Sequence, residues 1–244
     1  MKKLLLSLLL VSTVAVAPTP GRADDKPAAS APDGMSAEEI VNMVHYSRAL
    51  GRDKKTPLVF PGELSKDGKT VPFSISLTED YMRFQFENPR QTIHLDITDK
   101  NYRLKEVSAG SNKEVPASAY STGVRNTDLT YDDISMRYLF WPKKVKVGEE
   151  SIKTRKCFVV DLYNPARLGE YYLVRIFVDK QSGGLMRMQG YDWEGKLVKS
   201  CAVTAGMKVN GATMLKSMDV IRYVPGTKKV AGQTSFELQK PAGN

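Results

Sequence analysis

The residues of this chain that could do chemistry are few and are scattered along the sequence. Its 244 residues include only two histidines, His45 and His94, and two cysteines, Cys157 and Cys201. Neither histidine belongs to an HExxH motif or to another metal-ligand spacing. His94, which lies beside Asp96 in an alternating run, is expected to be exposed or hydrogen-bonded rather than a ligand. We therefore expect neither a metal nor any other cofactor.

The usual signatures of catalysis are missing as well. The sequence has no GxSxG elbow, no P-loop and no GxGxxG fingerprint. Cys157 lies between apolar strand-forming residues with no histidine near it in the sequence, which argues against a catalytic thiol. The pair Asp132-Asp133 is better explained as the start of a helix than as an acid–base pair. These features favour a binding protein over an enzyme.

Two cysteines in an exported protein first suggest a disulfide. If the strands pair in sequence order, however, two strands separate Cys157 from Cys201, which is three spacings of about 4.8 Å. A disulfide requires Cα atoms within about 7 Å of each other. We therefore expect free, partly buried thiols, although strong curling or another strand order would allow a bridge.

The amino terminus has the layout of a secretory signal peptide. A charged start, Met1-Lys2-Lys3, precedes an apolar run over residues 4–17 and a small-residue stretch that ends at Ala23. We expect cleavage after Ala23, with Ala17 as the alternative, and an exported, soluble mature chain in the periplasm. No cysteine stands at this site, so a lipid-anchored lipoprotein is not expected.

The charge of the mature chain is mildly basic and spread out. Of 36 basic residues, three precede the expected cleavage point, which leaves 33 against 27 acidic residues, or +6. The densest basic stretches are Lys143-Lys144 with Lys146, and Lys228-Lys229. A solvated surface explains this distribution better than nucleic-acid binding does, and attraction to an anionic membrane is a lesser alternative. The mature length suits one domain with a sizeable core.

Residues 155–238 predict an antiparallel meander. Turn signals such as Asn164-Pro165, Asn210-Gly211 and Pro225-Gly226 separate runs rich in Val, Ile, Phe, Tyr and Thr. No helical pattern lies between the runs, so a parallel sheet is not expected, and the meander is long enough to form a sandwich or an open barrel. The expected strands are Lys156–Leu162, Tyr171–Asp179, Leu185–Trp193, Leu197–Ala205, Thr213–Val224 and Val230–Leu238.

The first half predicts a leader, a helix and further strands. Residues 24–35 read as a flexible leader, and Ser36 with Glu39 forms a capping box for a helix that is expected to end near Leu50. Residues 108–130 form a long polar connection. Thr130 with Asp133 marks the start of a second helix, which belongs to a helical insertion expected near 116–140. The expected strands of this half are Pro57–Leu64, Val71–Leu77, Tyr81–Glu87, Gln91–Thr98 and Tyr102–Val107.

Alternate residues of a strand point to opposite faces, so each face can be examined separately. The strand at 171–179 is apolar on both faces, which indicates that it is covered on both sides. Methionines recur on neighbouring strands, and flexible methionine suits either an ordinary core or a surface that accepts varied apolar ligands. On the second interpretation, strand parity predicts a cavity lined by Met82, Phe84, Phe86, Trp141, Arg175, Phe177, Met186, Met188, Met214 and Met218 under a lid helix carrying Ile40 and Val44.

The order of these parts resembles the periplasmic outer-membrane lipoprotein-sorting proteins, the LolA-like lipoprotein carriers. The motifs that carry the resemblance are residues 126–133 (NTDLTYDD), 157–162 (CFVVDL), 178–180 (VDK), 191–197 (YDWEGKL) and 207–211 (MKVNG). The similarity covers most of residues 38–238. It implies a mainly β fold, an open antiparallel half-barrel whose concave apolar face is covered by helices, in a single domain over residues 36–240.

The resemblance also implies a function. Such proteins shelter the acyl chains of lipoproteins in an apolar cavity, receive them from an inner-membrane export complex and deliver them to an outer-membrane acceptor. We therefore expect a monomeric carrier of acylated lipoproteins or lipids, with no nucleic-acid partner. The alternative is a lipid-responsive regulatory module that binds a partner protein, and an envelope enzyme is the least favoured interpretation. Sensors of that kind usually have a further carboxy-terminal domain, and this sequence ends at Asn244, soon after its last predicted strand.

Overall fold

The computed structural model describes residues 34–49, 55–97, 103–108 and 111–241. The predicted signal peptide and most of the leader lie outside these ranges. The described strands are β1 (Leu58–Lys66), β2 (Lys69–Leu77), β3 (Tyr81–Phe86), β4 (Gln91–Asp96), β5 (Arg103–Ser108), β6 (Ser111–Glu114), β7 (Lys143–Ile152), β8 (Arg155–Tyr163), β9 (Leu173–Asp179), β10 (Leu185–Tyr191), β11 (Leu197–Val209), β12 (Ala212–Tyr223) and β13 (Val230–Leu238).

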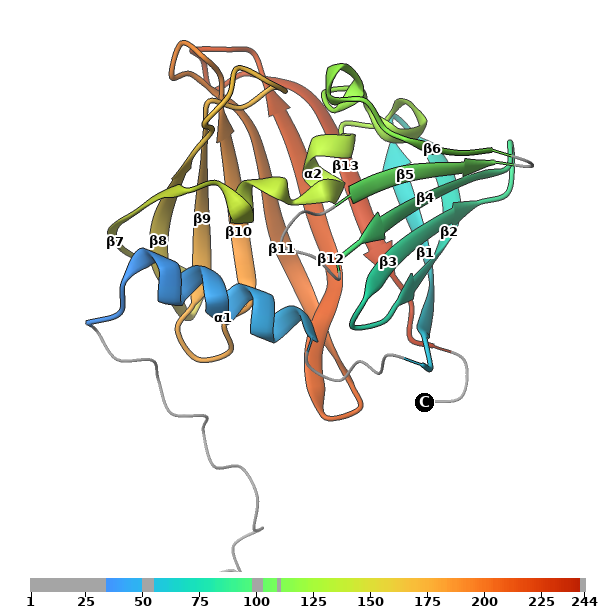
Figure 1. The fold of residues 1–244 in the computed structure, drawn as a ribbon, viewed down its shortest axis with the longest axis horizontal. Coiled ribbons are helices and arrows are strands. Elements are labelled where there is room, and N and C mark those ends of the chain that lie inside the picture. Colours follow the sequence, from blue (N-terminus) through green and yellow to red (C-terminus); the bar gives the residue numbers. More distant parts are fainter. Residues whose placement is uncertain (1–33, 50–54, 98–102, 109–110, 242–244) are drawn as a thin grey trace, which may run out of the picture.

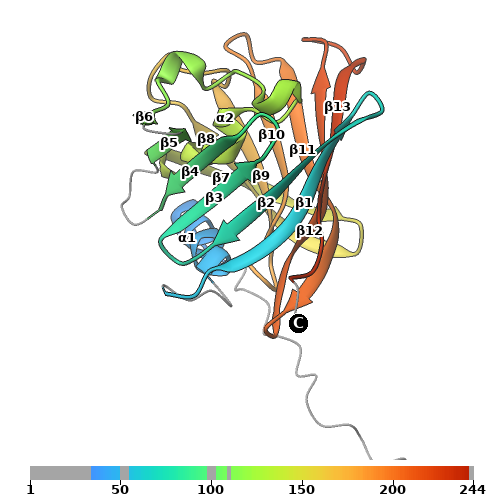
Figure 2. The ribbon, with the colours of Figure 1, turned by 90° about the vertical axis from the view of Figure 1, so that its right-hand side faces the viewer.

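All of these strands belong to one sheet, in the order β6-β5-β4-β3-β2-β1-β13-β12-β11-β10-β9-β8-β7. The sheet consists of two meanders, β1 to β6 and β7 to β13, which are joined where β1 pairs antiparallel with β13. The strongly curved sheet leaves β6 and β7 as its two separate edges, so the barrel stays open (Figures 1 and 2). The predicted open antiparallel half-barrel is confirmed.

Two strands escaped prediction, and both are edges of the sheet. β6 is four polar residues long, and β7 begins with alternating lysines in place of a full apolar face. Edge strands bury little, and charged side chains such as lysine protect them from pairing with another chain. The absence of an apolar pattern therefore follows from their position in the sheet.

Tight turns of the predicted kind connect several strands. At Asp67-Gly68, between β1 and β2, φ is 51° and 73°, and at Asn210-Gly211, between β11 and β12, it is 48° and 77°. Asp, Asn and Gly tolerate these positive φ values, and two such residues in succession match the right-handed twist of the flanking strands.

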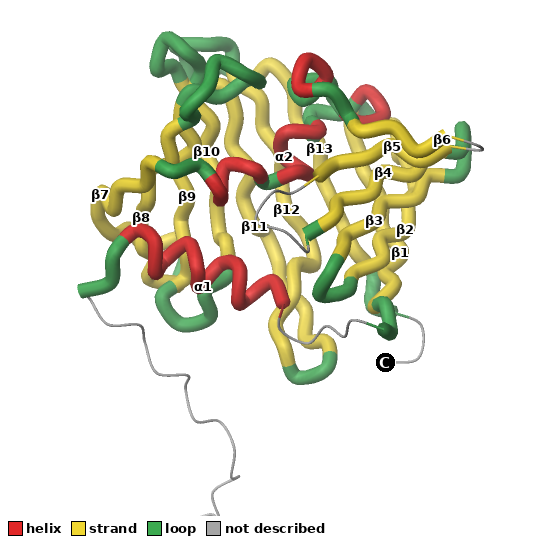
Figure 3. The backbone as a smooth tube through the Cα atoms, in the orientation of Figure 1, coloured by secondary structure: helices red, strands yellow, loops and turns green. Residues whose placement is uncertain are grey.

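The first helix, α1 (Ala37–Ala49), begins at the predicted capping box. The backbone N–H of Ser36 donates to the Glu39 carboxylate at 2.8 Å, and the Glu39 N–H donates to the Ser36 hydroxyl at 3.3 Å. The predicted end near Leu50 lies outside the described residues. Figure 3 shows α1 running across the concave side of the sheet, where it contacts β7 and β8.

The second helical segment is broken rather than continuous. It comprises the short helices η1 (Ala117–Ala119), η2 (Val124–Asn126), α2 (Tyr131–Ser135) and η3 (Arg137–Phe140). Thr130 and Asp133 form the expected capping box, but Met136 adopts the left-handed conformation with φ of 48°, which stops α2 after five residues. This segment connects β6 to β7 and so crosses the concave side of the half-barrel (Figures 1 and 3).

Both cysteines are free, as predicted. Cys157 lies on β8 and Cys201 on β11, with β9 and β10 between them in the sheet. Burial raises the pKa of both thiols, that of Cys157 to about 11, so neither carries the thiolate that a nucleophile needs at neutral pH.

Candidate ligand-binding face

A row of opposed residues shows that one apolar face continues across the middle of the sheet. Ile176, Met188, Cys201, Val220 and Thr234 are partners in the successive pairs from β9 to β13. Directly paired residues point to the same side of a sheet. This side is the concave one, because Ile176 and Met188 pack with residues of α1.

One part of this face, the α1 cluster, lies beneath α1 and η3. Ile40, Val41 and Val44 of α1 are at most 1% exposed. They pack against apolar residues of β8 to β11, with Tyr138, Leu139 and Trp141 completing the cluster. The predicted lid residues Ile40 and Val44, and the predicted lining residues Trp141 and Met188, therefore belong to one buried group.

The other part, the phenylalanine cluster, lies on β1 to β5, on β12 and on the carboxy-terminal ends of β11 and β13. The Phe73 ring lies 5.7 Å from the rings of Phe84 and Phe86 and 5.3 Å from that of Phe236, between ring centroids. Tyr131 and Ile134 of α2 cover it. Phe84 and Phe86 are buried here, and Met82, Met214 and Met218 are partly buried against the same cluster.

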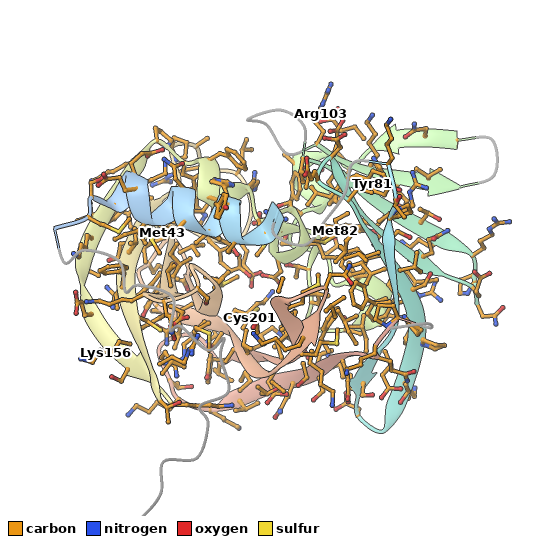
Figure 4. All side chains as sticks on the ribbon, turned by 90° about the horizontal axis from the view of Figure 1, so that it is seen from below. Met43, Tyr81, Met82, Arg103, Lys156 and Cys201 are labelled. Atoms are coloured by element: carbon orange, nitrogen blue, oxygen red, sulfur yellow. The ribbon has the colours of Figure 1, made fainter. Side chains whose placement is uncertain are left out.

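Cys201 is packed against both clusters and so marks the place where they meet. In Figure 4 it lies near the middle of the molecule, between Met43 on α1 and Met82 on β3. Sticks of side chains fill much of the space between the sheet and the helices in the same view. The described conformation therefore has its concave face covered by the protein's own apolar side chains.

Three predicted lining residues, Arg175, Phe177 and Met186, lie on the opposite, convex face, so the expectation that they join the others is wrong. Phe177 belongs to a separate buried group with Ile152 and Cys157, against which Met186 packs. Arg175 forms a two-pronged ion pair with Asp161, at 2.6 and 2.8 Å. Both faces of β9 are apolar, so parity alone could not tell which one the helices cover.

A β-bulge explains the misplaced methionine. Met186 and Met188 are two residues apart and would share a face in a regular strand. The pairing of β10 with β9 shifts between Leu185 and Arg187, so one extra residue lies in β10 at this point. The bulge turns Met186 to the convex side and leaves Met188 on the concave side.

A buried ionic network under α2 was not recognised from the sequence. Lys199 of β11 is completely buried, and its ammonium group lies 2.9 Å from the Asp133 carboxylate and 3.3 Å from that of Glu170. The Tyr171 hydroxyl donates to Asp133 at 2.7 Å. Burial lowers the pKa of Lys199, but the two carboxylates outweigh that effect and leave it above its ordinary value. A lysine inside the apolar run of β11 was the only signal in the sequence.

A second ion pair extends this network to the next loop. The Arg137 guanidinium donates to both carboxylate oxygens of Asp132, at 2.6 and 3.3 Å, and to the backbone carbonyl of Leu168 at 2.8 Å. Burial nevertheless holds the pKa of Asp132 above its ordinary value. Charge pairs thus fasten both α2 and η3 to the sheet and to the β8–β9 loop.

The polar contacts of α1 are weaker and more exposed. Lys144 of β7 forms an ion pair of 2.9 Å with Glu38, whose side chain is 63% exposed. At the other end of α1, the Ser47 hydroxyl donates to the carbonyl of Gly183 at 3.0 Å. Exposed ion pairs contribute about 0–1 kcal/mol. The position of α1 therefore depends mainly on its apolar side chains.

The histidine on α1 predicts a pH dependence. The His45 ring packs 4.8 Å from that of Phe140. Burial, assisted by the positive charges of Arg48 and Lys144 and opposed by Glu38, lowers the pKa of His45 to about 4. An unfolded histidine titrates near pH 6.5, so the unfolded state takes up a proton first and the fold loses stability as the pH falls from about 6.5 to about 4.

Allowing for its partial exposure, we expect this histidine to account for a loss of about 1–2 kcal/mol across that window. Urea unfolding of the wild type and of His45→Gln, at about pH 7 and about pH 4.5, measures this loss of stability. The variant should lose less stability on acidification than the wild type. Equal losses in both proteins would assign the effect to other groups.

His94 sits on the convex side of β4 and is hydrogen-bonded, as predicted. Arg83 Nε donates to its Nδ1 at 3.3 Å. Among the described residues, no three His, Cys, Asp or Glu side chains gather closely enough to hold a metal ion. None of the helices in the described ranges is both long and apolar enough to cross a lipid bilayer.

A protein-family model with the description "Uncharacterized protein" matches residues 104–241, more than half of the chain. The chain belongs to this family. The match includes the whole second meander, the broken helical segment and the buried ionic network. A comparison with curated proteins found no match.

Solved structures extend the likeness to most of the chain. A domain assigned as an outer membrane lipoprotein-sorting protein from Vibrio parahaemolyticus has a TM-score of 0.66 at 13% identity, covering 85% of this chain and 93% of that one. A DUF1329 family protein from Desulfovibrio piger gives 0.63 at 14%, with 86% and 94% covered. A LolA superfamily protein from Nitrosomonas europaea gives 0.61 at 12%, with 85% and 93% covered. At these identities the likeness is one of fold, and this family member has the predicted LolA-like fold.

Proposed function

We propose that this LolA-like protein shelters the acyl chains of a lipid or lipoprotein between the concave face of its sheet and α1, and carries them through the periplasm. The observation that carries the proposal is the apolar face that continues from β9 through β12 and joins the two clusters beneath a single layer of short helices. The fold it shares with a lipoprotein-sorting domain and a LolA superfamily protein supports the same role.

The energies of the two covers indicate which one gives way. Burying the three aliphatic side chains of α1 stabilises its docking by about 1.5–3 kcal/mol each. The broken segment buries Tyr131, Ile134, Tyr138 and Leu139 against the same face, and separating its buried pair of Asp133 and Lys199 costs about 3–5 kcal/mol in addition. We infer that α1 moves aside for cargo while the broken segment containing α2 and η3 stays in place.

An acyl chain is large enough to compensate for this movement. Each methylene group that leaves water contributes about 0.8 kcal/mol, so a chain of roughly 14 methylenes gains about 11 kcal/mol. That gain exceeds the combined burial of Ile40, Val41 and Val44, about 4.5–9 kcal/mol, by only a few kcal/mol, so cargo can displace the helix and still be released. A carrier requires such a balance, because it has to release what it binds.

The partners of this role follow from the same proposal. The cargo is an acylated lipoprotein or a lipid, the donor is an inner-membrane export complex, and the acceptor is an outer-membrane protein. The carrier acts as a monomer without a cofactor.

Native mass spectrometry of the mature protein, purified from a periplasmic extract without detergent, tests whether the protein carries acyl cargo. A mass increase of a fatty acid, phospholipid or acylated peptide is expected, and a bare mass with no uptake of added lipid would contradict it.

Two methionines provide a matched test of the face that binds. Met218 on β12 is partly buried on the concave side, and Met186 on β10 is partly buried on the convex side. Met218→Lys places a charge against the acyl chain and should weaken binding of a dansyl-labelled fatty acid at least about tenfold. Met186→Lys should bind the probe as the wild type does. Equal losses in two folded variants would mean that the concave face is not the binding site.

A further inference from the structure

A group of aromatic side chains on the convex side, which we call the aromatic rim patch, has no part in the proposed cavity. It consists of Tyr163, Tyr172 and Trp193, with Lys143 and Arg167 beside them, and we include the exposed Leu168, which follows Arg167 in the chain. The residues come from the start of β7, the end of β8, the β8–β9 loop and the β10–β11 loop. The two loops stand together at the upper left of Figure 1.

The rings of the patch form a continuous packed row. Tyr163 and Tyr172 meet edge to face with centroids 5.9 Å apart, and Trp193 follows 5.6 Å from Tyr172. Lys143 lies 4.4 Å over the Tyr163 ring, and the Arg167 guanidinium lies 5.8 Å over that of Trp193. Two of the three rings therefore have a cation beside them, and the third, Tyr172, is 39% exposed.

Leu168 is the most exposed apolar residue of the patch, and hydrogen bonds to its backbone carbonyl hold it in place. Leu168 is 50% exposed, yet its carbonyl accepts hydrogen bonds from Asn164 Nδ2 at 2.9 Å and from Arg137 at 2.8 Å. Asn164 Nδ2 also donates to the carbonyl of Tyr171 at 2.8 Å. A loop fixed in this way loses little conformational entropy when its tip is buried.

We propose that the aromatic rim patch docks the protein on an anionic lipid surface. Tyrosine and tryptophan are favoured at the headgroup level of a bilayer because one end of each is apolar and the other polar. Lysine and arginine beside them are attracted to anionic headgroups. Leu168 at the tip enters the apolar layer beneath. The net charge of +6 expected for the mature chain, with 33 basic against 27 acidic residues, acts in the same direction.

The patch is tied to the fixed cover of the concave face rather than to α1. Gly169 packs so closely on Arg137 and Asp132 that a Cβ atom there would overlap both side chains. Tyr171, at the end of the same loop, donates to Asp133 of α2. Docking therefore holds the sheet, α2 and η3 against the lipid surface as one unit, and α1 remains the cover that can shift. The inference extends the proposed function, and it can fail separately from it.

Vesicle flotation tests the docking with full-length mature protein. The probes are vesicles of phosphatidylglycerol and phosphatidylcholine in a one-to-two ratio, and vesicles of phosphatidylcholine alone. The wild type should bind the anionic vesicles more tightly than the phosphatidylcholine vesicles, and high salt should weaken its binding to the anionic vesicles. Leu168→Asp should weaken that binding about tenfold, and Lys143→Glu with Arg167→Glu should weaken it by a similar factor.

The matched control is Val59→Asp. Val59 is 44% exposed, similar to Leu168, but lies on β1, far from β8 in the sheet. It should leave vesicle binding unchanged. No binding of the wild type to anionic vesicles, or equal binding by Leu168→Asp, overturns the proposal. If the patch instead binds an envelope protein, the wild type will bind that protein and no vesicles, and Leu168→Asp will not bind the protein. This outcome also overturns the docking proposal.

The dansyl fatty-acid assay on the same proteins separates the two proposals. Leu168→Asp should take up the fatty acid as the wild type does, because Leu168 is half exposed and belongs to neither apolar cluster of the concave face. Vesicle binding without fatty-acid uptake supports docking and contradicts the carrier role. Uptake without vesicle binding supports the carrier role and overturns docking.

Discussion

Replacing Lys199 with methionine will lower the free energy of unfolding by about 3–5 kcal/mol. The side chain is fully buried, and its removal leaves the buried Asp133 carboxylate without its cation. Methionine has a similar length, so the packing of β11 is retained and the loss reports on charge. Chemical denaturation of the two proteins at neutral pH measures it.

The control for this substitution lies on the same strand. Lys208 of β11 is exposed, so Lys208→Met should change the stability by no more than about 0.5 kcal/mol. A cost below about 1 kcal/mol for Lys199→Met would show that Asp133 finds another partner or takes up a proton. In that case the broken segment would be as easily displaced as α1, and the assignment of α1 as the moving cover would lose its basis.

A disulfide that locks α1 will abolish uptake of acyl cargo until it is reduced. A Cβ atom built on Gly183, in the β9–β10 turn, lies 3.2 Å from the Cβ of Met43 on α1. Disulfides need about 3.5–4.5 Å between these atoms, and the same Cβ lies 2.9 Å from the Met43 carbonyl oxygen, so Met43→Cys with Gly183→Cys requires the β9–β10 turn to move slightly away from α1. Oxidised, the double variant should bind the dansyl fatty acid at least about a hundredfold more weakly than when reduced, since closed α1 occupies the face.

Comparing the oxidised and reduced forms of one protein removes the effect of the substitutions themselves. This matters because Gly183 has φ of 69°, where any other residue is strained. Gly183→Cys alone serves as the control and should respond little to reductant. Burial raises the pKa of the native thiols of Cys157 and Cys201, so they react slowly. Undiminished uptake by the oxidised double variant would mean that cargo enters without α1 moving.

Local structure could be predicted from the sequence where it depends on residues within a single helix or turn. The capping boxes at Ser36 and Thr130 formed as predicted, because each requires only residues that are three apart on one turn. The left-handed Met136 that ends α2 was missed, because no local signal marks it. Its neighbours Tyr138 and Leu139 are buried against the sheet, so tertiary packing determines where the helix breaks.

The candidate site divides in the same way. Met82, Phe84 and Phe86 lie in one cluster, because β3 is regular and only one of its faces is apolar, and their role in lining a cavity stays a prediction. On β9, which is apolar on both faces, parity separated the two sets but could not say which one α1 covers. Arg175 and Phe177 were therefore assigned to the wrong side.

By itself the sequence determined the antiparallel meanders, their turns and helix starts, and the resemblance to LolA-like carriers. The turns, helix starts and strands depend on residues within a few positions of one another, and the resemblance depends on their order along the chain. Only the tertiary structure decided that β1 pairs with β13, which makes one curved sheet from two meanders. It also decided which face is concave and brought Lys199, Asp133 and Glu170 together from three separate segments. Contacts of this kind join distant parts of the chain, and no local pattern of apolar and polar residues records them.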